Sequence, residues 1–193
     1  ILKCAGVNDD AFSNINNEID SLNNKAFAVI NDEKGKEMIA RIESAAEKGD
    51  SVGGVLETVV TGFPVGVGEP WFDSLESIIS HGLFSIPAIK GVEFGKGFSC
   101  ADMYGSEMND SFRIENDKIV TETNNNGGIN GGISNGMPLV IKCAVKPTPS
   151  ISKEQNTVDF INNENTTLSV KGRHDPCIVH RARIVADSEI GRA

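Results

Sequence analysis

Apolar residues alternate strictly with other residues between positions 137 and 145, and this period of two predicts a strand with one apolar face. That face carries Met137, Leu139, Ile141, Cys143 and Val145. The glycine-rich stretch TNNNGGINGGISNG precedes the strand, and the segment KPTPSI follows it. We expect the rest of the chain to be organised around this strand. Both of its ends carry unusual chemical groups.

Apolar residues spaced by three and four positions predict two long helices. The first covers residues 32–48, with acids in its first turn and Gly49 directly after its end. Its expected apolar stripe consists of Met38, Ile39, Ile42, Ala45 and Ala46. The second helix runs from Pro70, near its first position, to about Leu83. Its expected buried stripe consists of Trp71, Phe72, Leu75, Ile78 and Ile79.

Shorter β-branched and apolar runs predict further strands. They cover residues 1–7, 26–30 (a strand or an extended lead-in), 52–63 and 85–95, with hairpins at 112–123 and 157–170. Two segments are expected to be loops: residues 8–25, with a weak helical turn, and residues 94–110. Strands dominate and do not alternate regularly with helices. The predicted fold class is therefore α+β with mostly antiparallel sheets.

Composition narrows the class of protein. A chain of 193 residues with 39% hydrophobic content can bury a core, and we expect one domain over residues 1–193. The net charge of -9 argues against a nucleic-acid backbone or an anionic membrane as a general partner. The four cysteines lie far apart in the sequence and only three histidines are present, so we expect reduced cytosolic thiols and no metal site.

The two ends of the chain suggest a portion of a longer protein. The chain starts at Ile1, without a methionine, inside the apolar run ILKCAGV. It stops at Ala193, inside a segment with helical character. We therefore expect this sequence to be a fragment, with trimmed terminal residues as the alternative.

The two ends of the strand at 137–145 carry groups that suit a flat polar ring and a phosphate. Upstream, the Gly127-Gly128 and Gly131-Gly132 pairs permit positive φ and leave backbone N–H groups uncovered. Downstream, the loop has a lysine, two hydroxyls and two prolines that fix φ: Lys146, Pro147, Thr148, Pro149 and Ser150. Ordinary hairpin turns and a surface loop are the alternative interpretation.

The segment GRHDPC concentrates functional groups ahead of a predicted helix. Arg173 can bind a carboxylate or phosphate with two hydrogen bonds, and His174 can exchange protons near neutral pH. Asp175 can act as a base or orient a partner. A structural role is the alternative, with Asp175 capping the helix and Arg173 in a salt bridge.

Five motifs in this order, SIPAIKGVEFGKGF, GSEMND, TNNNGGINGGISNGMP, KPTPSI and GRHDPC, show that the chain resembles chorismate synthase from about residue 52 to 185. The resemblance implies a β-α-β-α sandwich, incomplete in this portion, and a homotetramer. It implies a cytoplasmic lyase of the shikimate pathway that eliminates phosphate from 5-enolpyruvylshikimate 3-phosphate in a 1,4-anti sense to give chorismate. Reduced FMN is required without net redox change, and NADPH as the source of its electrons is left open.

The resemblance also assigns roles to residues. Pro87, Ala88 and Gly131 are expected to line the flavin, and a Cβ at Gly131 would obstruct the ring. The loop of Lys146, Pro147, Thr148, Pro149 and Ser150 is expected to hold FMN. Arg173 is implied at the interface between flavin and substrate, and Asp175 near flavin N5 as the relay for the ring proton. These two residues are the predicted catalytic pair.

The motifs of the family's N-terminal part are absent from this sequence, including its essential histidines and most of its phosphate-binding arginines. We therefore expect a C-terminal portion of the enzyme and predict that the isolated chain does not turn over substrate. Two other classes are kept as alternatives: a non-catalytic module that binds flavin or phosphate, and a structural fragment without a ligand.

Overall fold

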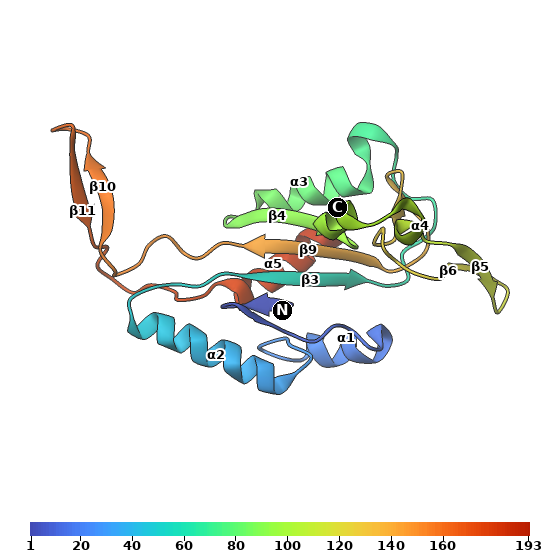
Figure 1. Ribbon diagram of the computed structural model, residues 1–193, viewed down its shortest axis with the longest axis horizontal. Helices are drawn as coiled ribbons and strands as arrows, with labels where there is room; N and C mark the ends of the chain where they lie inside the picture. The colour runs from blue at the N-terminus through green and yellow to red at the C-terminus, as the bar shows by residue number, and fades with distance from the viewer. The chain divides into compact units, whose positions relative to one another are not determined.

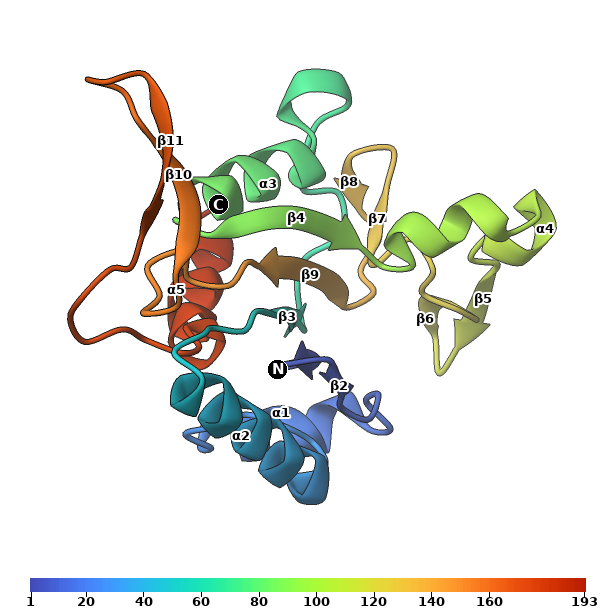
Figure 2. The same ribbon diagram turned by 60° about the vertical axis from the view of Figure 1, so that its left-hand side comes forward.

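The structure is a computed structural model that describes residues 1–193. The chain forms two compact units. Figures 1 and 2 colour the chain by residue number from its N-terminus to its C-terminus. The first unit combines Ile1–Val55 with Val145–Ala182, and the second combines Leu56–Ala144 with Arg183–Ala193. The single domain over residues 1–193 stays a prediction, and each unit is described by itself.

The first unit begins with a hairpin where the sequence predicted one strand over residues 1–7. β1 (Lys3–Cys4) pairs antiparallel with β2 (Val7–Asn8). The turn between them holds Ala5 at a φ of 50° and Gly6 at 81°, which is the geometry of a two-residue hairpin turn. β1 also pairs antiparallel with the start of β3 (Gly54–Val60), where Cys4 lies opposite Gly54.

Two helices follow in the first unit. α1 (Ile15–Asn23) lies where we expected a loop, and side-chain hydrogen bonds explain its formation. Asn14 accepts a hydrogen bond from the Asn17 N–H, and the Glu18 carboxylate accepts one from the Ser13 hydroxyl at 2.7 Å. α2 (Asp32–Glu47) confirms the first predicted helix. Residues 26–30 form no strand and lead into α2.

The apolar stripe predicted for α2 is only partly correct. Met38 is fully buried, and Gly35, which the stripe did not include, is buried as well. Ile39 is 40% exposed and therefore does not belong to the buried stripe. The hairpin of β10 (Gln155–Asp159) and β11 (Glu164–Leu168) completes this unit and confirms the prediction for that region.

The second unit contains three neighbouring strands in the order β3, β9 (Leu139–Val145) and β4 (Ile89–Phe94). β9 and β4 run in opposite directions in Figures 1 and 2, and the Gly95 N–H donates to the Val140 carbonyl at 2.9 Å. Every second residue of β9 is buried, which confirms the organising strand: Leu139, Ile141, Cys143 and Val145.

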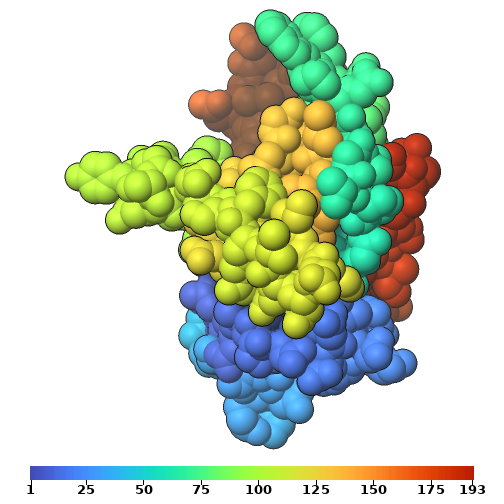
Figure 3. All heavy atoms as spheres, turned by 90° about the vertical axis from the view of Figure 1, so that its right-hand side faces the viewer, coloured from blue at the N-terminus to red at the C-terminus, as the bar shows by residue number.

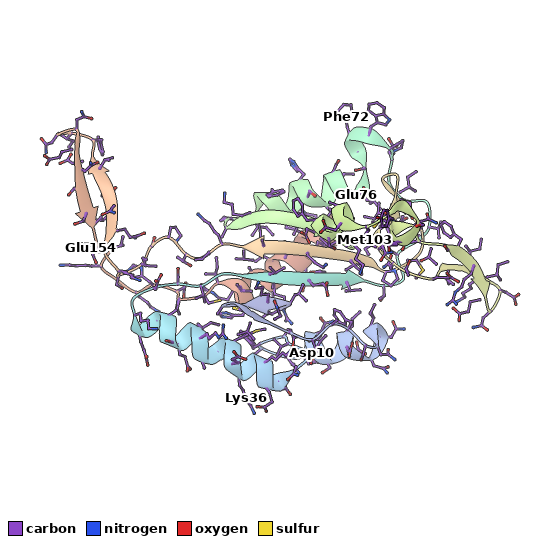
Figure 4. The ribbon with its side chains drawn as sticks, viewed as in Figure 1. Asp10, Lys36, Phe72, Glu76, Met103 and Glu154 are labelled. Atoms are coloured by element: carbon purple, nitrogen blue, oxygen red, sulfur yellow. The ribbon has the colours of Figure 1, made fainter.

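The second predicted helix begins later than expected. α3 (Leu75–Ser85) starts after Ser74, whose hydroxyl accepts from the Ser77 N–H at 3.1 Å. Trp71 lies in the short 3₁₀ turn η1 (Trp71–Asp73) at a φ of 70°, which an α-helix cannot include. Trp71 and Phe72 are 84% and 87% exposed, so the prediction that they belong to a buried stripe is wrong. Figure 4 shows Phe72 at the outer tip of this loop.

The predicted loop over residues 94–110 contains two short helices, η2 (Gly97–Asp102) and α4 (Gly105–Met108). The hairpin of β5 (Phe112–Glu115) and β6 (Lys118–Thr121) confirms the prediction for that region. Figure 3 shows these green-to-yellow segments at the surface. A further hairpin, β7 (Ile129–Asn130) with β8 (Ile133–Ser134), lies in the glycine-rich stretch.

The last helix, α5 (Val179–Arg192), follows the GRHDPC segment as predicted. It begins in the first unit and ends in the second. The hairpins and the β1–β3 ladder are antiparallel, which agrees with the predicted α+β class. Judged by length and hydropathy, none of the helices qualifies as a membrane span.

Candidate functional site

The loop after β9 contains a buried hydroxyl without a partner. The Thr148 Oγ1 atom is inaccessible to solvent and forms no hydrogen bond. The backbone around it is held firmly, because the Thr148 carbonyl accepts from the Ser51 hydroxyl at 2.6 Å. A buried hydroxyl that lacks a partner costs about 1–3 kcal/mol, and such an atom calls for an explanation. A bound polar ligand would supply the missing partner.

Two cations of the first unit are unpaired. The side chains of Lys146 and Arg173 are exposed, and neither forms an ion pair or a hydrogen bond. Arg181, in the first turn of α5, is bound to the Asp175 carboxylate instead. Lys146 and Arg173 are therefore available for an anion, such as a phosphate or a carboxylate.

The structure contains neither the helix cap by Asp175 nor the salt bridge of Arg173 that the alternative interpretation proposed. α5 begins at Val179, so Asp175 lies too far upstream to cap it. Asp175 accepts a hydrogen bond from Arg181, and Arg173 forms no salt bridge. The His174 ring contacts the Val170 carbonyl through Nε2 at 2.8 Å, which fixes the ring in the loop.

Two adjacent residues hold the Lys146–Ser150 loop and the GRHDPC segment in the first unit, and we call these two stretches the cationic segments. The Ser51 hydroxyl donates to the Thr148 carbonyl at 2.6 Å, and the Val52 N–H donates to the Pro176 carbonyl at 2.8 Å. The loop after β9 and the segment before α5 are thereby attached to neighbouring positions of the same stretch. The structure thus brings together these two of the three predicted segments.

The predicted residues of the second unit lie in turns with unusual backbone. Gly131 and Gly132 form the two-residue turn of the β7–β8 hairpin, at φ values of 61° and 88°. A Cβ at Gly131 would meet no atom of the chain within 4 Å, so only the left-handed φ or a ligand could require glycine there. Ala88, which follows Pro87 in the turn before β4, has a φ of 79°, a strained value for a residue with a Cβ.

Asp110 organises the glycine-rich stretch, and the sequence analysis did not single it out. Its side chain is buried, with the residue only 4% exposed. It accepts hydrogen bonds from the Thr123 hydroxyl at 2.7 Å, the Asn125 N–H at 2.7 Å and the Asn126 N–H at 2.9 Å. The motif GSEMND contains this aspartate and was the available signal.

Burial raises the pKa of Asp110, but the hydrogen bonds from Thr123 and the two asparagines outweigh burial, so its pKa lies below the usual value. A carboxylate with a lowered pKa stabilises the fold above its unfolded pKa of about 4. This contribution is lost as the pH falls through the lower, folded pKa. The carboxylate is therefore expected to be fully effective at neutral pH.

We expect Asp110→Asn to lower the free energy of unfolding by about 2–3 kcal/mol at pH 7, because the charge-assisted hydrogen bonds are weakened. The difference from the wild type should shrink at pH 3, because this pH lies below the unfolded pKa of about 4 and part of the contribution has been lost. Urea unfolding at both pH values measures this. Asp117→Asn, in the exposed turn of the β5–β6 hairpin, is the control and should have little effect. An equal loss for Asp110→Asn at both pH values would contradict the expected role of the charge.

The three predicted segments do not all lie in one unit. Pro87, Ala88 and Gly131 belong to the second unit, whereas the Lys146–Ser150 loop and Asp175 belong to the first. Their convergence on one hollow stays a prediction. No group of three or more histidine, cysteine, aspartate or glutamate side chains is arranged to hold a metal ion.

The fold and the two cationic segments define an α+β protein suited to binding an anion. The comparisons with known proteins then identify its family. The family model described as chorismate synthase matches residues 1–191. The chain belongs to the chorismate synthase family.

Individual relatives agree with this assignment. The chain is 55% identical over 153 residues to the chorismate synthase of Dehalococcoides mccartyi, covering 79% of this chain and 42% of that protein. It is 50% identical over 158 residues to that of Methanosarcina barkeri, covering 82% of this chain and 43% of that protein. A crystal structure of chorismate synthase matches with a TM-score of 0.66 and 31% identity, over 83% of this chain and 41% of that one. The chain thus spans less than half the length of these relatives.

Proposed function

We propose that this chain supplies part of the active site of a chorismate synthase and works within a longer enzyme. The proposed reaction is the 1,4-anti elimination of phosphate from 5-enolpyruvylshikimate 3-phosphate, with loss of a ring proton, to give chorismate. Membership of the family and relatives named chorismate synthase support this proposal. We also propose a cytoplasmic homotetramer that uses FMN as its cofactor, with NADPH as one source of electrons for the flavin.

One observation carries the proposal. Ser51 and Val52 attach the loop of Thr148 and the segment of Arg173 to neighbouring positions. Thr148 Oγ1 is buried without a partner, and Lys146 and Arg173 are cations without counterions. Hydroxyl and cation together suit a phosphate-bearing ligand, and both FMN and the substrate carry a phosphate.

The residues present fit FMN. Lys146 through Ser150 would hold it by the lysine charge and the two hydroxyls, with the prolines fixing the loop. Pro87, Ala88 and Gly131 would line the flavin ring. When bound, reduced FMN supplies electron density that eases the departure of phosphate.

Two residues of the chain would stabilise charge and transfer the proton. Arg173 stabilises the negative charge that develops when phosphate leaves, because a guanidinium binds phosphate oxygens with paired hydrogen bonds. Asp175 accepts and passes on the ring proton. Arg181 donates a hydrogen bond to the Asp175 carboxylate and holds it in position.

Thr148→Val tests the cofactor site. The substitution keeps the shape of the side chain and removes a hydroxyl that has no partner in the protein, so the ligand-free protein should lose no stability and could gain some. The affinity of the full-length enzyme for FMN should fall about tenfold, the loss expected for one hydrogen bond to a ligand. Thermal melting and quenching of FMN fluorescence measure the two effects.

Thr121→Val is the matched control. The Thr121 hydroxyl is buried and donates to the Thr123 carbonyl at 2.5 Å, so its removal should destabilise the protein. It lies outside the Lys146–Ser150 loop and should affect FMN binding only through stability. Unchanged FMN affinity in Thr148→Val, or a stability loss equal to that of Thr121→Val, would argue against a ligand at Thr148.

A further inference from the structure

Two buried thiols face one another in the first unit. Cys4, at the end of β1, and Cys177, just before α5, have their Sγ atoms 3.6 Å apart. Their exposed fractions are 0% and 3%. All four cysteines of the chain are free, and Cys4 and Cys177 form the one pair of thiols in contact.

Backbone contacts fix this approach. Cys4 lies opposite Gly54 in the antiparallel ladder between β1 and β3. A Cβ at Gly54 would lie 3.1 Å from the Cys4 Cα and 3.1 Å from the Val179 Cγ2, so the missing side chain lets the two segments meet. The Val52 N–H holds the Pro176 carbonyl at 2.8 Å. The backbone positions of the two cysteines are therefore fixed by the framework of the unit.

The pKa values of the two thiols are shifted in opposite directions. A hydrogen bond from Cys4 lowers the pKa of Cys177 to about 7 against the opposing effect of burial, and the Val179 N–H adds to the lowering. The same hydrogen bond and burial raise the pKa of Cys4. The shifts make Cys177 the more readily deprotonated thiol of the pair. A nucleophilic thiolate thus lies beside a thiol that can react in the following step.

We propose that Cys4 and Cys177 form a reversible disulfide when the protein meets hydrogen peroxide. The Cys177 thiolate attacks one peroxide oxygen, the O–O bond breaks, and sulfenic acid and hydroxide form. The Cys4 sulfur then attacks the Cys177 sulfur, the S–O bond breaks, and the second oxygen leaves as water after the Cys4 proton has been transferred. The sum is two thiols and one peroxide giving one disulfide and two waters.

The bond needs only a small movement. The sulfurs must approach from 3.6 Å to about 2.05 Å. The product would link β1 to the segment that carries Arg173 and Asp175, two positions that the proposed function places in the active site. The residues it joins lie 173 positions apart, so the cross-link restricts the unfolded chain strongly.

Peroxide treatment followed by alkylation under denaturing conditions tests the proposal on the 193-residue chain. We expect two alkylated cysteines in place of four, a mass 2 Da lower before alkylation, and a digest in which the Cys4 and Cys177 peptides are joined. Dithiothreitol should restore four alkylated cysteines. The cross-linked chain should keep its circular dichroism spectrum and melt at least about 5 °C above the reduced chain.

Variants of the other thiols are the controls. Cys100→Ala removes an exposed thiol, and Cys143→Ala removes a buried thiol whose pKa burial raises to about 11. Both should still form the cross-link, whereas Cys4→Ala and Cys177→Ala should not. If either of these fails to fold, the position of the cross-link in the wild-type digest decides the question.

Each of the following results would overturn the proposal: four alkylated cysteines after treatment, stable sulfinic acid on Cys177 with Cys4 still free, or a cross-link that includes Cys100 or Cys143. A cross-link that appears only together with loss of the native circular dichroism signal would overturn it as well. None of these readouts depends on chorismate formation, so failure here leaves the proposed function untouched.

Discussion

Replacing Asp175 with asparagine is expected to lower turnover by the full-length enzyme about 10²- to 10⁴-fold, the range typical of losing a positioned acid or base. Asparagine keeps the size of the side chain but cannot accept the ring proton. FMN affinity should stay nearly unchanged, because the Lys146–Ser150 loop and the charge of Arg173 remain. Anaerobic assays of chorismate formation with reduced FMN, together with FMN fluorescence titration, measure the two quantities.

Asp159→Asn is the control for this experiment. Asp159 ends β10 and accepts hydrogen bonds from the Ile161 and Asn162 N–H groups, at 2.9 Å and 3.1 Å. It belongs to an exposed hairpin turn outside the two cationic segments, so its replacement should leave turnover unchanged. If Asp175→Asn is as silent as this control, the catalytic assignment is wrong. A module that binds flavin or phosphate without catalysis then becomes the better hypothesis.

Short sequence patterns correctly predicted the elements that depend on interactions between residues close together in the sequence. The alternation in β9 was predictable because one face of the strand packs into the core. α2 was predictable because acids begin it, an apolar stripe repeats along it, and Gly49 follows it at a φ of 65°. The β5–β6 turn, where Asn116 and Asp117 take positive φ, follows from residues that tolerate that conformation.

The errors arose where a single cap or turn outweighed the apolar pattern. Trp71 and Phe72 continue the periodic spacing of α3, yet Ser74 caps the helix after them. The apolar residues of α1, Ile15, Ile19 and Leu22, are not buried, and the capping by Asn14 together with the Glu18 contacts to Ser13 stabilises its first turn. Side-chain hydrogen bonds of this kind depend on geometry that hydrophobic periodicity does not record.

For the site, the sequence indicated residue types and the structure added the connections between them. Motif order placed Lys146, Thr148 and Arg173 on the candidate list, but nothing in their spacing predicted that Ser51 and Val52 hold both segments. The meeting of Cys4 with Cys177 was equally invisible, because 173 positions separate them. Contacts between residues so far apart in the sequence depend on how distant strands pair, and no short sequence pattern encodes that pairing.

The close approach of two backbones at Gly95 has the largest expected effect on stability. Gly95 has a φ of 55°, and a Cβ there would collide with the Asn125 carbonyl oxygen and lie 2.5 Å from the Gly127 nitrogen. Both atoms belong to the glycine-rich stretch that Asp110 organises, and the Lys96 N–H donates to the Asn125 carbonyl at 2.8 Å. Backbone atoms cannot rotate away as a side chain can, so the strands or the stretch must shift.

Gly95→Ala is therefore expected to lower the free energy of unfolding by about 3 kcal/mol or more, the sum of a left-handed φ and overpacking. Gly62→Ala is the matched control, since Gly62 has a φ of 71° and no atom within 4 Å of an added Cβ. It should cost only about 1–2 kcal/mol, from backbone conformation alone. Urea unfolding of the two variants separates the cost of the backbone conformation from the cost of the collision. A larger loss of unfolding free energy in Gly95→Ala than in Gly62→Ala measures the collision. Similar losses in the two variants would mean that the glycine-rich stretch moves easily and that Gly95 does not fix its position.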